Sequence, residues 1–143
     1  MDDATGRTSR VIRLARHLEL ARRATLAARD LDVWEYDVLV ALRASGSRCE
    51  LTPGELITQT QVSSGTMTNR IDRLDRRGCV TREPDPDDSR GVRVRLTASG
   101  RKKIDAAVAD VAKAEQAIWQ QLGERKRINL DDAVLDILAP FDA

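Results

Sequence analysis

The chain has 143 residues, of which 41% are hydrophobic and 33% charged, so it holds enough apolar material for one folded domain and too much for a disordered tail. Its 24 Lys and Arg nearly balance 23 Asp and Glu, and a net charge of +1 taken alone argues against a nucleic-acid binder. No apolar run approaches the roughly 20 residues that span a bilayer, and the N-terminus lacks the apolar segment of a signal peptide. We therefore expect a cytoplasmic protein without a membrane partner. With two Cys and one His, neither a disulfide framework nor a metal site, resident cofactor or His-based catalytic site is expected.

The charge is unevenly distributed along the chain. Residues 63–103 hold 11 Lys and Arg against six acids, a net of +5, whereas residues 104–143 have a net of −4. Residues 1–62 are neutral overall, although residues 7–29 hold seven Arg and one acid. Because partners respond to the local field, a basic middle segment predicts an acidic partner there; the alternative is a set of ordinary solvated helix faces.

Helical spacing of apolar residues predicts the first two elements. A helix over about residues 9–28 has Ser9 as its N-cap, and a second helix over about residues 32–44 ends at Ser45-Gly46. The apolar face of the first helix holds Val11, Leu14, Leu18 and Ala21. Residues 49–51 are long enough only for a very short strand.

A helix-turn-helix pattern follows. Thr52-Pro53-Gly54-Glu55 is a strong helix start, because Thr caps the helix, Pro fits its first turn and Glu completes a capping box. This helix ends near Gln59, and the next begins at Ser63-Ser64 and ends at Arg76-Arg77-Gly78. The buried stripe of the second helix is predicted to hold Met67, Ile71 and Leu74. Two helices joined by a short turn form a helix-turn-helix.

Two strands are predicted after this pair. Residues 79–83 and 92–96 both alternate, and residues 84–91, rich in Pro and Asp, predict a turn-rich loop between them. The result is a β-hairpin with a long tip. A hairpin that follows a helix-turn-helix makes a winged helix.

The chain closes with two further helices. Thr97 opens a long one that Gly123 ends, and a short one over residues 130–138 stops before Pro140. The inner face of the long helix is predicted to hold Ile104, Val108, Val111, Ile118 and Leu122. The expected fold class is therefore mainly α (α+β), a winged helix-turn-helix with long N- and C-terminal helices.

The predicted domain organisation is one winged-helix domain over residues 1–143. Terminal helices at about 9–30 and 97–143 flank a core at about 32–96, whose wing is 80–96. The terminal helices carry apolar stripes outside the core, and leaving them in water costs about 25 cal/mol per Å². We expect these helices to pair in a homodimer; the alternative is that they fold back on their own domain.

The second helix of the pair is suited to a DNA major groove, because its exposed face is polar and its N-terminus is rich in short donors. Arg70 or Arg73 could read guanine, Arg90 at the hairpin tip could enter a minor groove, and Arg93 could bind phosphate. The predicted DNA contacts are Ser63, Ser64, Thr66, Thr68, Asn69, Arg70, Arg73, Arg90 and Arg93. Two-fold symmetry would place two such helices about 34 Å apart, one turn of double-stranded DNA.

Each of these residues has a structural alternative. Thr68 and Asn69 could be plain surface residues of a helix. The Arg residues could instead pair with nearby acids, Arg70 with Asp72 or Asp75 and Arg90 with Asp85, Asp87 or Asp88.

The run from Leu51 to Gly100 resembles the winged-helix core of the MarR family of bacterial regulators. Asp88-x-Arg90 and the Leu96-Thr97 … Gly100 after it match the family pattern, whereas Ser89 stands where many members have a second Arg. The resemblance implies a sequence-specific, ligand-responsive transcriptional regulator, typically a repressor. It also implies a homodimer, interlocked by the terminal helices, on a pseudo-palindromic operator.

The sequence SSGTMTNRIDRL, with Glu35-Tyr36-Asp37-Val38-Leu39 upstream, is similar to the PecS-like, urate-responsive branch of that family. That branch senses an anionic ligand with a Trp, an Asp and two Arg, and Asp37, Arg70 and Arg82 match the last three. The Trp belongs to an additional N-terminal helix, with which Trp34 does not align. The resemblance implies a small anionic effector, urate-like or a carboxylate, with Asp37, Arg70, Arg82 and Trp34 as candidate ligand-binding residues. The alternatives are a structural salt bridge from Asp37 to either Arg and core packing of Trp34.

Two other functions stay open at this point. Cys49 or Cys79 could make the chain a redox-sensing regulator of the same fold, although buried Cys is more often structural. A winged helix can also serve protein contacts without DNA. An enzyme is not expected, because the sequence holds no nucleophile–base arrangement, no Gly-rich phosphate loop and no metal spacing.

Overall fold

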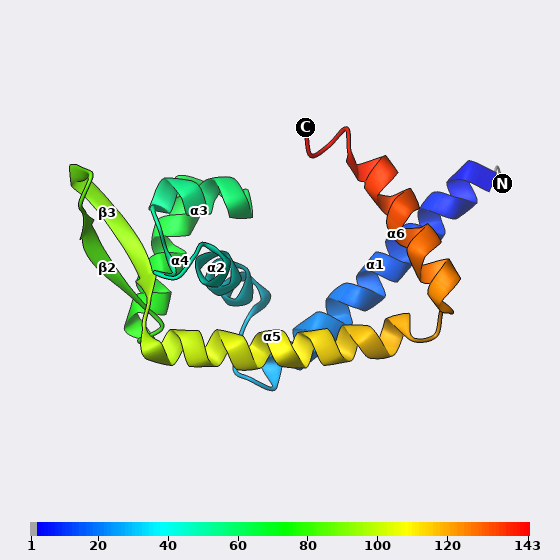
Figure 1. The fold of residues 1–143 in the computed structure, drawn as a ribbon, viewed down its shortest axis with the longest axis horizontal. Helices are drawn as coiled ribbons and strands as arrows, with labels where there is room; N and C mark the ends of the chain where they lie inside the picture. Colours follow the sequence, from blue (N-terminus) through cyan, green and yellow to red (C-terminus); the bar gives the residue numbers. More distant parts are fainter. Residues whose placement is uncertain (1–2) are drawn as a thin grey trace.

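The computed structural model describes residues 3–143. A winged-helix core lies at one end of the molecule, and the N-terminus and the last helix lie at the other (Figure 1). In chain order the elements are α1 (Asp3–Ala27), α2 (Val33–Ala44), β1 (Glu50–Leu51), α3 (Pro53–Thr60), α4 (Ser64–Arg76), β2 (Val80–Asp85), β3 (Asp88–Leu96), α5 (Ala98–Trp119) and α6 (Glu124–Leu138). The expected mainly α winged helix is confirmed.

The core is aliphatic and centres on α2, whose Val38, Leu39 and Leu42 are fully buried. The predicted stripe of α4 is confirmed, since Met67, Ile71 and Leu74 are all buried in the same cluster. Burial of such aliphatic side chains is worth about 1.5–3 kcal/mol each, so this shared cluster holds α2, α3 and α4 together.

Local capping sets the helix-turn-helix. The Thr52 hydroxyl accepts a hydrogen bond from the Glu55 N–H, and the Glu55 carboxylate accepts one from the Thr52 N–H, which is the predicted capping box. Ser63 caps α4 by accepting from the Thr66 N–H at 3.2 Å. Gln61, between the two helices, adopts a left-handed conformation with φ of 55°. These short-range contacts fix where α4 begins.

The sheet has the strand order β1-β3-β2 and is antiparallel, with Val80 opposite Leu96 and Leu51 opposite Val94. The predicted long tip of the hairpin is wrong. β2 continues through Asp85 and β3 begins at Asp88, so only two residues form the turn. The Asp85 carboxylate accepts a hydrogen bond from the Asp87 N–H at 3.0 Å. The acids therefore form a turn only at the tip, and the residues on either side of it remain in the strands.

Two helix boundaries differ from prediction. α1 already includes Asp3, the first described residue, so Ser9 is not an N-cap; its hydroxyl donates to the Thr5 carbonyl at 3.1 Å inside the helix. α6 begins at Glu124, six residues before its predicted start. Ala4 is the only hydrophobic residue of segment 3–8 and Ile128 the only one of segment 124–129, so neither segment has an apolar periodicity from which a helix could be predicted.

α5 is a long helix that extends from the base of the wing to the start of α6 (Figure 1). Its buried positions include Ile104 and Val111 as predicted, but Val108 is 39% exposed, and Gly100 and Ala107 occupy the inner face instead. The C-terminal part of α1 contacts α5 through the ion pair Arg22–Glu115, and Arg29, which lies in the turn after α1, pairs with Asp110 of α5. The hydrogen bond from Arg29 lowers the pKa of Asp110.

The outer parts of α1 and α6 carry apolar side chains that the described part of the chain does not cover. No residue of α6 is buried, so the alternative in which this helix folds back onto its own domain is wrong. The large exposed apolar residues of α1, α6 and the C-terminal tail are Val11, Ile12, Leu14, Leu20, Ile128, Val134, Leu135, Ile137, Leu138 and Phe141. Within residues 3–143, no helix is long and apolar enough to cross a membrane.

Candidate nucleic-acid interface

The N-terminal turn of α4 presents hydroxyl groups whose local bonds leave part of their capacity free. Ser63 donates its hydroxyl to Thr66 Oγ1 at 2.9 Å, so the Thr66 proton is available to an acceptor outside the helix. Thr68 donates to the Ser64 carbonyl at 3.0 Å, which leaves its lone pairs available to a donor. The side chain of Asn69 lies on the exposed face. These groups can bind phosphate oxygens or base edges.

Arg70 and Arg73 of α4 both lie over the ring of Trp34, with their guanidinium carbons 5.4 and 4.8 Å from its centroid. Neither Arg forms an ion pair with any residue between Asp3 and the C-terminus. The alternative in which Arg70 pairs with Asp72 or Asp75 is therefore wrong. The structure brings Trp34, Arg70 and Arg73 together at the surface of the core.

Asp72 and Asp75 instead bind Arg82 of β2, the contact to Asp75 being 3.0 Å long. This triad ties the wing to the side of α4. Arg82 was predicted to share a ligand site with Asp37, but the structure commits its guanidinium to these two carboxylates and records no ion pair between Asp37 and any Arg of the described chain. The structural salt bridge considered for Asp37 is thus not formed.

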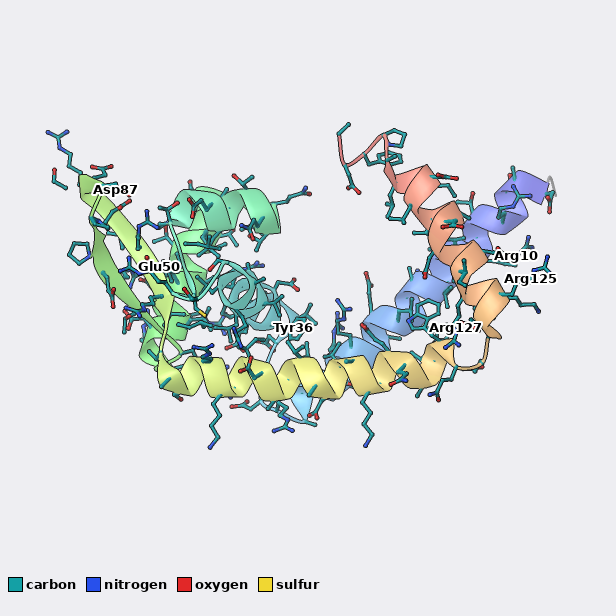
Figure 2. The ribbon with its side chains drawn as sticks, in the orientation of Figure 1. Arg10, Tyr36, Glu50, Asp87, Arg125 and Arg127 are labelled. Atoms are coloured by element: carbon teal, nitrogen blue, oxygen red, sulfur yellow. The ribbon has the colours of Figure 1, made fainter. Side chains whose placement is uncertain are left out.

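The arginines of the wing differ in whether an acid binds them. Arg93 is 23% exposed and is bound by Asp85 at 3.1 Å, Asp87 at 3.4 Å and Glu50 at 3.9 Å. A hydrogen bond from the Asp87 N–H and the contact with Arg93 lower the pKa of Asp85. Asp87 lies at the tip of the hairpin and Glu50 nearer its base (Figure 2). Arg93, predicted to bind phosphate, is therefore held within the wing.

Arg90 lies beside the tip of the wing and is exposed. Its backbone N–H donates to Asp88 Oδ1 at 3.0 Å, but its guanidinium forms no ion pair within the described chain. The alternative in which an acid of the hairpin holds this guanidinium is wrong. Arg90 is thus a cation without an acid partner among the described residues, and it lies near the start of β3, next to the hairpin turn.

Asp37 faces a cleft of about 610 Å³ between α1, α2 and α5, which Arg22, Arg23, Glu115 and Trp119 also line. Partial burial raises the pKa of Asp37, and the charges of Arg22 and Arg70 oppose that rise. Arg22 also lies over the Tyr36 ring, 5.8 Å from its centroid. Of the four predicted ligand-binding residues, Trp34 and Arg70 are in contact. Asp37 is near enough to Arg70 for that charge to oppose the rise in its pKa, whereas Arg82 lies away from them, bound to Asp72 and Asp75.

Sequence reasoning missed one charged cluster behind α4. Glu35 is only 3% exposed, and its carboxylate binds Arg77 at the end of α4 and accepts from the Asp32 N–H at 3.0 Å. Arg77 also donates to the carbonyl of Asp30 at 2.7 Å and to its carboxylate at 3.1 Å. The partners lie more than 40 residues apart in the sequence, so no local spacing reveals them. Together they fix α4 to the connection between α1 and α2.

Both cysteines are buried, and burial raises the pKa of the Cys79 thiol. Reactive cysteines are usually accessible and have a lowered pKa, so these two have the character of packing residues. The structure therefore does not support the redox alternative.

Comparisons with known proteins agree with this arrangement. Residues 29–91 match the model of the MarR family. The chain is similar to the transcriptional regulator PecS of Dickeya dadantii, with 29% identity over 100 residues, 70% of this chain and 60% of PecS. It is also similar to the multiple antibiotic resistance protein MarR of Escherichia coli K12, with 33% identity over 105 residues, 73% of this chain and 66% of that protein. The matches thus span less than two thirds of the length of these curated relatives.

The likeness extends to solved structures. A mutant MarR from E. coli in complex with operator DNA has a TM-score of 0.78 and 26% identity, covering 91% of this chain and 92% of that one.

Proposed function

The chain belongs to the MarR family, and from this premise we propose that it is a DNA-binding transcriptional regulator, a repressor that acts as a homodimer on a pseudo-palindromic operator. The observation that carries the proposal is a set of arginines that have no acid partner among the described residues, Arg70 and Arg73 on α4 and Arg90 on the wing. Their neighbours Arg82 and Arg93 are instead bound by carboxylates. Free guanidinium groups are what phosphates and guanine edges require.

In this proposal α4 enters a major groove. Arg73, Arg70 and the Asn69 amide read base edges, while the N-terminal hydroxyls from Ser63 to Thr68 contact phosphates and set the register. Arg90 reaches the adjacent minor groove. Arg93 serves the interface indirectly, by holding the wing in shape through Asp85 and Asp87.

Replacing Arg90 by Ala should weaken binding of all DNA sequences several-fold and reduce the slope of log affinity against log salt by about one, because one phosphate or groove contact is lost. Fluorescence anisotropy with labelled duplexes at several salt concentrations measures both. Lys113→Ala, which removes one exposed charge from α5, is the matched control and should leave both unchanged. An Arg90→Ala protein with the affinity and salt slope of wild type would remove the wing from the mechanism.

The homodimer is proposed to form where α1 and α6 leave apolar side chains in water. Leu135 and Ile137 are 64% and 68% exposed in the single chain, so Asp can be introduced there without disturbing the core. Leu135→Asp and Ile137→Asp should therefore remain folded but become monomeric, because a charge at the centre of an apolar interface loses its water.

Light scattering coupled to size-exclusion chromatography measures this effect, and circular dichroism checks that the variants are folded. Ser47→Asp, an equivalent change outside the terminal helices, is the control and should stay dimeric. A wild-type chain that is monomeric at micromolar concentration contradicts the proposed dimer.

A small anionic effector completes the proposal. The cations available to it near Asp37 are Arg23, which lines the same cleft, and Arg70. An anion bound there releases DNA only if it binds one arrangement of the core and the terminal helices better than the other. Urate and benzoate are suitable probes: release of a bound duplex by either, reduced in Arg70→Ala, supports the effector, and no release by any such anion removes it from the proposal.

A further inference from the structure

Two chemically different kinds of contact hold arginines of the core. Carboxylates bind Arg77, Arg82 and Arg93, and those contacts use the guanidinium N–H groups. Arg70 and Arg73 are held by an aromatic face, and their N–H groups have no carboxylate partner in the part of the chain that the structure describes. This division follows the proposed interface, because only the second kind lies on its surface.

We infer that Trp34 is a positioning residue for DNA recognition: its ring orders Arg70 and Arg73 while leaving their hydrogen-bond donors available to the bases. The inference rests on the proposed function. A guanidinium offers its flat face to an aromatic ring and carries its five N–H donors around its edge. A cation–π contact with the Trp34 ring therefore restricts side-chain rotamers without a hydrogen bond to the groups that read guanine.

The backbone fixes the ring in turn. Trp34 is half-buried in the first turn of α2, directly before the buried Glu35, which binds Arg77 at the C-terminal cap of α4. The same ion pair thus sets the distance between the Trp34 ring and the helix that carries the two arginines.

The ring also reaches the surface where DNA is proposed to lie. Trp34 lines a hollow of about 390 Å³ whose other residues all belong to α4: Gly65, Thr66, Asn69, Arg70 and Arg73. Three of these are the base-reading residues of the proposed function. Trp34 is therefore the one α2 residue among those that form this part of the described surface.

The affinities for operator and for scrambled DNA tell whether Trp34 positions the arginines or only stabilises the fold. Substitution of Trp34 leaves every charge in place, so the salt slope and the affinity for a scrambled duplex should stay as in wild type. Affinity for the operator should fall, because bidentate reading of a base needs an ordered guanidinium. Loss of two cation–π contacts corresponds to a decrease in the operator-to-scrambled ratio of about fivefold to thirtyfold.

The experiment measures this ratio for wild type, Trp34→Leu, Trp34→Phe and Trp34→Tyr with the DNA upstream of the protein's own gene and a scrambled duplex. Leu keeps apolar volume without a π face, whereas Phe and Tyr keep a weaker face, so the expected order is Trp, then Tyr and Phe, then Leu. Melting curves show whether each variant is folded. If Trp34→Leu does not fold, the comparison of wild type with Phe and Tyr decides the outcome.

A spectroscopic measurement gives an independent readout. The chain has only two Trp residues, so in a Trp119→Phe background the emission comes from Trp34 alone. Operator DNA should change that emission more than scrambled DNA does, and Arg73→Gln should reduce the difference. The inference is overturned, while the proposed function stands, if all Trp34 variants have the same operator-to-scrambled affinity ratio or if DNA does not change the Trp34 emission. Absence of specific binding by wild type overturns the proposed function itself.

Discussion

Replacement of Gly100 by Ala should lower the free energy of unfolding by about 3 kcal/mol, because no space exists for a methyl group there. A Cβ at this position would lie 2.0 Å from the carbonyl oxygen of Cys79 and 2.8 Å from its carbonyl carbon. Both are backbone atoms, so relief requires movement of the chain between α4 and β2 away from α5. That movement would also break the hydrogen bond from the Thr97 N–H to the same carbonyl, which is 3.0 Å long.

Urea denaturation followed by circular dichroism measures the loss. Gly65→Ala is the matched control, because the added Cβ meets nothing within 4 Å in the described structure and a helical Ala is favoured over Gly. It should stabilise the protein by up to about 1 kcal/mol. A Gly100→Ala protein that unfolds at the urea concentration of wild type would show that the contact between α5 and the start of the wing is looser than the structure has it.

Replacement of Arg77 by Met should destabilise the fold by about 3 kcal/mol, since it leaves the carboxylate of Glu35 without its cation in a site that is 3% exposed. The two bonds from Arg77 to Asp30 are lost as well, so α4 is released from the connection between α1 and α2. Operator binding should weaken more than non-specific binding, because the same link sets the position of α4 against Trp34.

The double variant Glu35→Met with Arg77→Met separates the ion pair from the packing. It removes both charges and should recover much of the stability, because a buried pair replaced by apolar side chains of similar volume is often tolerated. Arg76→Ala is the control on the neighbouring residue, which is exposed and forms no ion pair with the described residues, and it should be neutral. If the double variant is as unstable as Arg77→Met alone, then loss of packing, and not the unpaired Glu35, is the cause.

The sequence was most informative where structure is set by neighbours in the chain. The capping box at Thr52, the start of α4 at Ser63-Ser64 and the stripe of Met67 and Leu74 depend on contacts between residues three or four apart, and the structure confirms each of these predictions. The hairpin tip at residues 84–91 was misread because Pro and Asp favour turns wherever they stand, whereas pairing with β3 decides how many of them remain in the turn. The predicted ranges of α1 and α6 begin too late, because the first residues of both helices show no apolar pattern.

The site was predictable as a set of exposed residues but not as a set of contacts. Arg70, Arg82 and Arg93 look alike in sequence, each a cation near acids. Only the fold decides which of them meets a carboxylate and which meets a ring, because Trp34, Asp72 and Glu50 come from three different elements. The net charge of +5 over residues 63–103 is therefore a poor measure of the field at the surface; the cations without acid partners are the better one.

The most direct test of the account is a titration of wild-type protein with the duplex upstream of its own gene, at 50 and 200 mM salt, with the number of bound chains measured by light scattering. We predict two chains per duplex and an affinity that falls by about a thousandfold between the two salt concentrations, because several phosphates release counterions on binding. A scrambled duplex should bind much more weakly at both. No preference for the upstream duplex, a single bound chain, or an affinity indifferent to salt would contradict it.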